Sequence, residues 1–177
     1  MDNPAKTLTP DAIAEAALAL IDEEGLEAFS TRKLGARLGV EAMALYHHFP
    51  NKGLLLRRAA SKLRESIPLP ADKTMGWRAW MGQAARSTRA VALAHPRAFA
   101  LLGPRAFVPP AALRVLVSAG FSERDAARTA RIMAAFLNGI IAAEIAEPEA
   151  MEGAFERGLV MVLDGIARAH QRVSAPS

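Results

Sequence analysis

Two glycines, Gly35 and Gly39, stand four residues apart where apolar residues recur at helical spacing. Gly35 has no side chain at a point where a second helix could cross closely. Gly39 can take the left-handed backbone conformation that ends a helix, because it has no Cβ to clash. The pattern predicts one helix over about 31–38 and a second over about 41–48, closed by Pro50. This spacing is typical of a helix-turn-helix.

The second of these helices would expose an unusual set of side chains. Leu45 and Phe49 share the face that packs on the preceding helices. Met43, Tyr46 and His47 are then left toward solvent. A mostly uncharged face flanked by cations suits the major groove of DNA, where apolar groups meet thymine methyls and polar rings reach phosphates or base edges. A helical hairpin that packs Tyr46 and His47 on a partner is the alternative.

Charge is distributed unevenly within the net value of +4. Residues 11–27 contain six carboxylates and no Lys or Arg, a local charge of minus six. Residues 30–64 contain eight Lys or Arg and one Glu, a local charge of plus seven. The basic segment coincides with the two short helices, which favours nucleic acid as a partner, although a charge run is more often only a solvated face.

Helix signals recur along the rest of the chain, and no stretch shows a convincing strand alternation. Thr9 followed by Pro10 predicts a helix start, and Gly25 predicts its end. Pro68 and Pro70 end a fourth helix and begin a linker. More helices are predicted over about 77–94, 97–102, 110–119, 122–145 and 149–173. The sequence therefore predicts an all-α fold.

Several classes of protein are disfavoured by what the sequence lacks. Cys is absent and the first ten residues carry no basic-then-apolar signal, so we expect a cytoplasmic protein. The longest apolar stretch, 132–146, is too short for a bilayer, so we expect no membrane partner. His47 and His48 point about 100° apart on a helix, which makes them a poor metal pair. Without a nucleophile motif or a phosphate loop, we expect no enzyme, metal or cofactor.

The segment STRKLGARLGVEAMALYHHFPNKGLLLRRA, residues 30–59, resembles the DNA-binding region of the TetR family of bacterial transcriptional regulators. Thr-Arg-Lys-Leu, Leu-Gly-Val, Leu-Tyr-x-His-Phe and Asn-Lys all occur in family order, and the resemblance covers about residues 9–64. It implies that Arg32 reaches a base, guanine above all, that Thr31 contacts phosphate and that Asn51 caps the fourth helix. The other DNA-contacting positions that it implies are Ala42, Met43 and Ala44 for bases or backbone, and Tyr46, His47, His48 and Lys52 for phosphates.

The side chains at 42–44 also predict how an operator would be read. All three are small or apolar, so they offer little of the amide-type hydrogen bonding that reads adenine. We therefore expect greater reliance on Arg32, on contacts with thymine methyls and on DNA shape.

The carboxy-terminal part also resembles TetR relatives, through AHPRAFALLG, AGFSERDAARTA and FERGLVMVLDGI. Those relatives dimerise through their last two long helices, which implies a homodimer on a palindromic operator of double-stranded DNA. Two apolar stripes occur in this region, at Phe136, Gly139, Ile140 and Ala143 and at Phe155, Leu159, Val162, Leu163 and Ile166. A core within one chain explains both stripes equally well. Gly139 would let a neighbouring helix come close in either case.

Apolar and aromatic residues of the same region are candidates for a small-molecule cavity. They are Trp80, Met81, His95, Phe99, Phe107, Met133 and Phe136. The candidate polar groups for this cavity are Arg86, Arg89, His95 and Arg105. Each apolar residue taken alone is more simply a core residue. The acidic series from Glu144 to Glu156 is expected to be solvated surface rather than a metal site.

The resemblance implies three parts. A three-helix DNA-binding domain with the helix-turn-helix would occupy 1–50, a connecting helix and linker 51–70, and a helical bundle for ligand binding and dimerisation 71–177. The expected function is that of a repressor that an unknown small-molecule effector releases from DNA by binding its two conformations unequally. A DNA-binding regulator controlled by a protein partner, or without a small effector, is the alternative. A helical module that never touches DNA is a third possibility.

Overall fold

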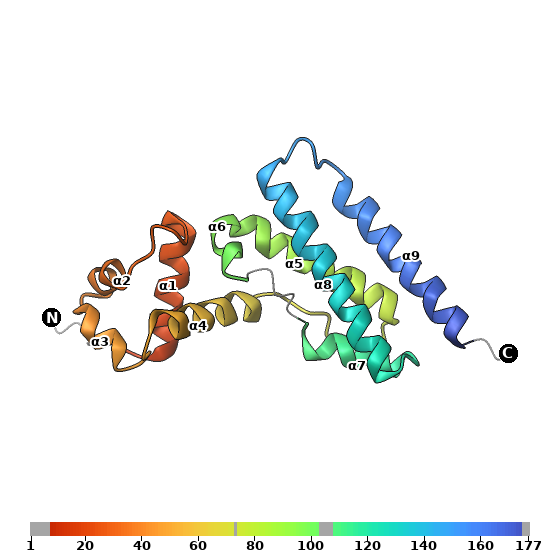
Figure 1. Cartoon of the computed structure of the whole chain (residues 1–177), viewed down its shortest axis with the longest axis horizontal. Coiled ribbons are helices and arrows are strands. Elements are labelled where there is room, and N and C mark those ends of the chain that lie inside the picture. The colour runs from red at the N-terminus through yellow and green to blue at the C-terminus, as the bar shows by residue number, and fades with distance from the viewer. Residues whose placement is uncertain (1–7, 73, 103–107, 175–177) are drawn as a thin grey trace. The chain divides into compact units, whose positions relative to one another are not determined.

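The computed structural model describes residues 8–72, 74–102 and 108–174. These residues form helices and contain no strand, so the predicted all-α fold is confirmed (Figure 1). The helices of the amino-terminal part are α1 (Pro10–Glu24), α2 (Thr31–Leu38), α3 (Ala42–Tyr46) and α4 (Lys52–Glu65). They are followed by α5 (Trp77–Ala94), α6 (Pro96–Phe99), the 3-10 helix η1 (Ala100–Leu102), α7 (Pro110–Ser118), α8 (Glu123–Ala146) and α9 (Ala154–Ser174).

Polar side chains cap four of these helices. The side-chain oxygens of Thr9, Ser30 and Asn51 accept hydrogen bonds from the backbone N–H three residues on, at 3.1, 3.2 and 2.9 Å respectively. Ser122 starts α8 with the same contact, at 3.1 Å. Each cap satisfies a backbone donor that the first turn of a helix leaves unpaired. The helix start predicted at Thr9 and the cap expected at Asn51 are therefore confirmed, and Ser30 caps α2.

Some helix boundaries differ from the prediction. α3 ends at Tyr46 rather than near residue 48, ahead of Pro50, which lacks an N–H and restricts the backbone of the residue before it. α9 begins at Ala154 rather than near residue 149, because Gly153 has a φ of 67° in the left-handed region and interrupts the helix. The helix predicted over 97–102 is α6 followed by η1.

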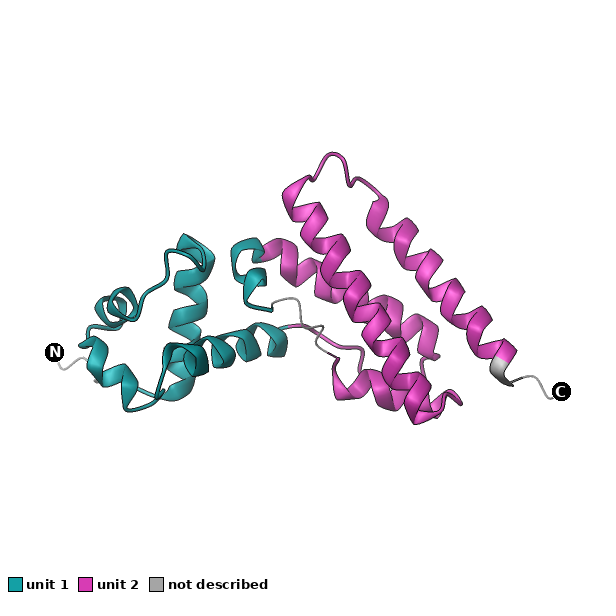
Figure 2. Cartoon of the chain, viewed as in Figure 1, with its two compact units in different colours: residues 1–66, 95–102 teal, residues 67–94, 103–177 magenta. Residues whose placement is uncertain are grey.

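Packing divides the chain into two compact units (Figure 2). Unit 1 contains the residues up to Ser66 and, from farther along the chain, His95–Leu102. Unit 2 contains Ile67–Ala94 and the residues after 102. This grouping differs from the expected parts 1–50, 51–70 and 71–177, because α4 and α6 both pack on α1. The buried side chains of α4 thereby belong to the same core as those of α1.

Unit 2 is a bundle of α5, α7, α8 and α9, in which α8 contacts the other three. One core cluster consists of Leu116, Phe121, Ala126, Ala130 and Ile166. The Phe121 ring meets Trp77 edge-on, with ring centroids 5.4 Å apart, and stacks on His170 at 3.7 Å. These aromatic contacts join α5, the turn before α8 and the end of α9.

α8 is long and apolar enough to cross a membrane by length and composition alone. It contains the apolar stretch 132–146 and matches the helix that the sequence predicts over about 122–145. Its buried residues include Ala126, Ala130, Met133 and Ile141. The core helix of a soluble protein can pass the same test of length and composition, and α8 contacts α5, α7 and α9 in unit 2.

Candidate nucleic-acid interface

The turn between α2 and α3 depends on two glycines. A Cβ at Gly35 would lie 2.8 Å from the Val40 carbonyl oxygen and 3.1 Å from the Ala42 nitrogen, so only glycine lets α3 cross α2 this closely. Gly39 has φ 70° and ψ 29°, the left-handed conformation. The Val40 N–H then donates to the Gly35 carbonyl at 2.9 Å, which closes the turn. The predicted helix-turn-helix geometry is confirmed.

The side chains of α3 divide between core and solvent as the helical spacing predicts. Leu45 and Phe49 are buried in unit 1. Met43 is 69% exposed and Tyr46 is 41% exposed, and His47 is exposed as well. These side chains therefore do not lie inside unit 1. α3 presents an uncharged, apolar and aromatic face to solvent.

The remaining candidate DNA contacts surround this face. Ala42, Ala44 and His48 are half-buried. Thr31 is the first residue of α2, and its Oγ1 lies 3.5 Å from the Tyr46 hydroxyl oxygen. Two hydroxyl groups, one from each helix of the motif, therefore lie together at the edge of the exposed face.

Lys52 is exposed, but its ammonium already has a partner inside unit 1. Its Nζ donates a hydrogen bond to the Phe29 carbonyl oxygen at 3.0 Å and lies 5.2 Å from the centroid of the Phe29 ring. The contact joins the first residue of α4 to the chain just before α2. Sequence reasoning missed this contact, because it links residues 23 positions apart in no local pattern.

At least four of the eight cations in residues 30–64 pair with carboxylates within unit 1. Lys33 pairs with Glu24 at 2.6 Å, and Arg37 makes two hydrogen bonds to the Glu23 carboxylate at 2.6 and 2.7 Å. The hydrogen bonds from Arg37 hold the pKa of Glu23 below its usual value. The acidic segment 11–27 thus neutralises part of the local charge of plus seven. Arg32, by contrast, is exposed and its side chain forms no ion pair or hydrogen bond with the described residues.

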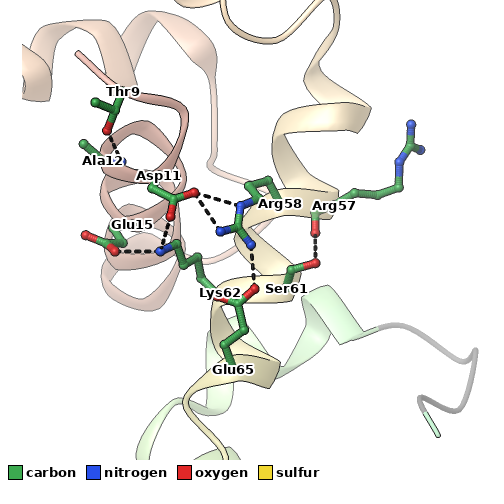
Figure 3. Close-up of polar contacts among 9 residues, drawn as sticks. All are labelled: Thr9, Asp11, Ala12, Glu15, Arg57, Arg58, Ser61, Lys62 and Glu65. Atoms are coloured by element: carbon green, nitrogen blue, oxygen red, sulfur yellow. Dashed lines mark hydrogen bonds and ion pairs between the residues drawn. The ribbon is translucent and has the colours of Figure 1, made fainter. Parts of the chain in front are cut away.

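A second set of ion pairs joins α1 to α4 (Figure 3). Arg58 donates to Asp11 at 2.7 and 3.0 Å and to Glu65 at 2.6 Å. Lys62 donates to Asp11 at 2.8 Å and to Glu15 at 3.0 Å. The hydrogen bonds from Lys62 and then Arg58 lower the pKa of Asp11. These two cations of α4 therefore help to hold α4 against α1 in unit 1.

The described candidate cavity residues are divided between the two units. Trp80, Met81 and Met133 are buried in unit 2, and Phe136 packs its ring against Gly158 of α9. His95 and Phe99 belong to unit 1. The His95 Nδ1 lies 2.8 Å from an Asp22 carboxylate oxygen of α1. Phe107 lies outside the described residues.

Two of the candidate polar groups for the cavity form ion pairs with carboxylates of other helices. Arg89 binds Glu144 through two hydrogen bonds, and Arg86 binds Glu156 at 2.8 and 3.0 Å, so α5 is tied to α8 and to α9. Glu144 is only 13% exposed in its side chain, so it is not the solvated carboxylate that the sequence predicts. Arg105 lies outside the described residues.

A groove of about 710 Å³ in unit 2 contains one of the candidate cavity residues, Trp80. Trp77, Met75 and Ser118 also line it, together with Arg114 of α7. The Trp80 indole donates to the Pro70 carbonyl at 3.0 Å, which fixes the ring at the groove wall. The Arg114 side chain makes no ion pair or hydrogen bond with the described residues. The sequence carries no local signal for Arg114, because its helix lies far along the chain from the two tryptophans.

Comparison with known proteins places both parts of the chain in one group. Residues 13–59 match the bacterial regulatory proteins of the tetR family, and residues 69–153 match the tetracyclin repressor-like C-terminal domain. The class A tetracycline repressor from transposon 1721 of Escherichia coli is 31% identical over an alignment of 200 residues, which covers 91% of each chain. The HTH-type transcriptional repressor DrrR1 of Streptomyces coeruleorubidus is 42% identical over 94 residues, 52% of this chain. The match spans about a third, 35%, of that relative's length.

Solved structures give the same result for the fold. A TetR variant from Acinetobacter baumannii AYE, crystallised in complex with minocycline, superimposes with a TM-score of 0.81. It is 30% identical in sequence, and the superposition covers 92% of this chain and 98% of that one. The similarity therefore extends over both units, beyond the helix-turn-helix alone.

Proposed function

This chain belongs to the tetR family of bacterial regulatory proteins, and we propose that it is a repressor that binds a palindromic operator as a homodimer and is released by a small molecule. The observation that carries the proposal is the exposed face of α3. Met43, Tyr46 and His47 point to solvent from a short helix that Gly35 and Gly39 hold against α2. Such a protein would act in the cytoplasm, where its DNA is.

We assign base contacts to the centre of this face. Met43, with Ala42 and Ala44 beside it, offers methyl and methylene groups that suit thymine methyls in the major groove. Arg32 has a guanidinium without a partner among the described residues, and a guanidinium can make two hydrogen bonds to guanine. The residues assigned to phosphates are Thr31, Tyr46, His47, His48 and Lys52.

The proposed homodimer forms through α8 and α9. Ile132 of α8 is 56% exposed and Met161 of α9 is 71% exposed. A Cβ added at Gly139 or Gly165 would meet no other heavy atom of the described chain within 4 Å. Exposed apolar side chains beside small residues favour the close approach of a second copy. A twofold axis through this contact would place two α3 helices about 34 Å apart, one turn of DNA.

The effector is proposed to bind unit 2. A related TetR variant from Acinetobacter baumannii AYE was crystallised in complex with the small molecule minocycline. Two indole rings and the unpartnered guanidinium of Arg114 in the groove of about 710 Å³ support a small aromatic or anionic ligand there. A ligand of this kind releases DNA only if it binds the DNA-free conformation more tightly.

The DNA-reading role is tested with operators recovered by selection from random duplexes. Arg32→Ala is expected to cost about 1–3 kcal/mol of binding free energy at one base position and to relax specificity there. Fluorescence anisotropy on duplexes with single base changes measures this. An equal loss on every duplex would contradict the assignment of Arg32 to a base.

The effector is tested by screening small molecules against the protein bound to its selected operator. A compound that raises the melting temperature of the protein and releases the duplex supports the proposal. If every compound that raises the melting temperature leaves the duplex bound, control by a protein partner becomes the better account.

A further inference from the structure

The described cations of unit 1 differ in what holds their side chains. Lys33, Arg37, Arg58 and Lys62 are held by carboxylates of α1 or of their own helix. Lys52 is held by a backbone carbonyl. Within the part of the chain that the structure describes, the side chains of Arg32 and Arg57 form neither a hydrogen bond nor an ion pair. Arg32 already has an assigned role, whereas Arg57 has none.

Arg57 lies on a different side of α4 from the ion pairs with α1. Figure 3 shows Arg58 and Lys62 turned toward Asp11 and Glu15, while the Arg57 side chain extends away from them. Of these three cations of α4, two point toward α1 and Arg57 points away from it. Arg57 is exposed, and the network that fixes α4 on α1 does not use it.

The guanidinium of Arg57 lies back along the helix toward its beginning. Its Nη1 is 3.8 Å from the position that a Cβ of Gly53 would occupy. This follows from helix geometry, because side chains lean toward the amino terminus and cover the residue four positions earlier. Gly53 has no side chain, so the space beside the first turn of α4 is open to the guanidinium. That turn follows α3 and its exposed face directly in the chain.

This position is electrostatically unfavourable without an anion. The beginning of a helix carries partial positive charge, and Lys52 adds a full charge in the same turn. No acidic residue occurs in the first turn of α4, and none of the described carboxylates pairs with Arg57. A phosphate of another molecule would compensate this positive charge.

We propose that Arg57 binds a phosphate of the DNA backbone next to the bases that α3 reads. The inference rests on the proposed DNA-binding function and adds a contact to it. A guanidinium matches the geometry of two phosphate oxygens and stays charged at any physiological pH. The contact is independent of base sequence, so it contributes to affinity and to the placement of α3 rather than to base choice.

The test uses the full chain and a labelled duplex of arbitrary sequence, because a phosphate contact needs no operator. Binding is measured by fluorescence anisotropy between about 50 and 200 mM salt, the range over which phosphate contacts change affinity strongly. The variants are Arg57→Ala, Arg57→Lys and the control Arg124→Ala. Arg124 is exposed on α8 of unit 2 and forms no ion pair with the described residues, so its removal takes away the same charge elsewhere.

We expect Arg57→Ala to weaken binding and to reduce the slope of log K against log salt by about 0.9 for each phosphate that the protein no longer neutralises. Arg57→Lys should recover part of both effects, and Arg124→Ala should match the wild type. An Arg57→Ala slope equal to that of Arg124→Ala would overturn the inference while the proposed function stands. Wild-type protein that binds no duplex at any salt concentration would overturn both. If Arg57→Ala lowers the melting temperature in proportion to the loss of binding, then Arg57 stabilises the fold instead of contacting DNA. That result would also overturn the inference.

Discussion

The Lys52 side chain has a structural role within unit 1 and a proposed role in DNA binding. One of its three N–H groups donates to the Phe29 carbonyl and holds the start of α4 beside the start of α2. The others are available to a phosphate, as the family resemblance implies. Only the second task could be predicted from the sequence, because a hydrogen bond between distant residues leaves no local pattern. The inward and outward sides of α3, by contrast, follow from helical spacing alone.

We predict that Lys52→Ala weakens binding to every duplex by a similar factor and also lowers the free energy of unfolding by about 1 kcal/mol. The stability decrease comes from the Phe29 carbonyl, which loses its donor. Urea unfolding and anisotropy on unrelated duplexes measure the two effects. Arg57→Ala is the matched control, since it should reduce binding without reducing stability. An unchanged free energy of unfolding in Lys52→Ala would show that the hydrogen bond to Phe29 does not stabilise the fold.

A second prediction at this scale concerns Gly35. Gly35→Ala places a Cβ 2.8 Å from the Val40 carbonyl oxygen, a backbone atom that cannot rotate away. We expect stability to fall by about 1–3 kcal/mol and DNA binding to be abolished, since α3 must move. Thermal unfolding followed by circular dichroism checks it. Gly39→Asn is the control, expected to cost less than about 1 kcal/mol because Asn tolerates the left-handed conformation. Similar stability of Gly35→Ala and wild type would refute the close crossing.

At the scale of helices, α5 is tied to α8 and α9 by two arginine–carboxylate pairs. Arg89 binds Glu144 and also lies 4.9 Å from the centroid of the Phe155 ring of α9. Arg86 binds Glu156 in the same two-bond manner, but Glu156 is 50% exposed. The hydrogen bonds from each arginine lower the pKa of its carboxylate, against the smaller opposing effect of burial. The more buried pair is expected to contribute more to stability, because solvent screens the exposed one.

The pair of Arg89 with Glu144 makes stability depend on pH. The folded-state pKa of Glu144 lies below its ordinary value of 4.5, so its carboxylate stabilises the fold above about pH 4.5, and this contribution is lost as the pH falls through the folded-state pKa. Urea unfolding between about pH 6 and pH 3 should therefore show a flatter pH dependence for Glu144→Gln than for wild type. Glu156→Gln is the control and should change the dependence less. Parallel curves for Glu144→Gln and wild type would contradict the role of the pair.

The helix positions were largely predictable, but helix contacts were not. Pro, Gly and capping residues mark boundaries locally, so most helices begin and end where the sequence predicts. The expected close approach at Gly139 was wrong within the chain, since a Cβ there would meet no other described heavy atom within 4 Å. The close approach between α8 and α9 occurs at Gly158 instead, where a Cβ would lie 2.9 Å from the Phe136 ring. Which of two glycines faces a neighbour depends on how α8 and α9 rotate in the bundle, and the sequence does not specify that rotation.

At the scale of the whole molecule, the sequence predicts how many charged and apolar residues each segment carries. It does not predict which residues they contact. The acidic and basic segments were evident from composition, yet part of their mutual neutralisation depends on pairs between α1 and α4 that lie 47 positions apart or more. Likewise the predicted apolar stripe of α9 packs in the core of unit 2, as at Leu159, whereas the exposed apolar residue Met161 lies outside that stripe. Only the folded bundle shows which apolar side chains remain for a second copy.

We predict that Met161→Glu converts the proposed dimer to a monomer without unfolding it, because the side chain is already 71% exposed in a single chain. Light scattering at micromolar concentration and circular dichroism measure the two properties. Val117→Glu on α7 is the control, since Val117 is also an exposed apolar residue but lies on a different helix. A wild-type protein that is already a monomer at that concentration would contradict the dimer.

The central claim is that the exposed face of α3 reads the major groove of DNA. Selection of bound duplexes from a random pool by the full-length protein tests it most directly. We expect enrichment of a palindrome whose half-sites are centred about one helical turn apart. The same selection with Met43→Asp and Tyr46→Ala combined should lose that palindrome while the protein remains folded. Recovery of the same palindrome by this double variant, or no enriched sequence with the wild type, would contradict the account.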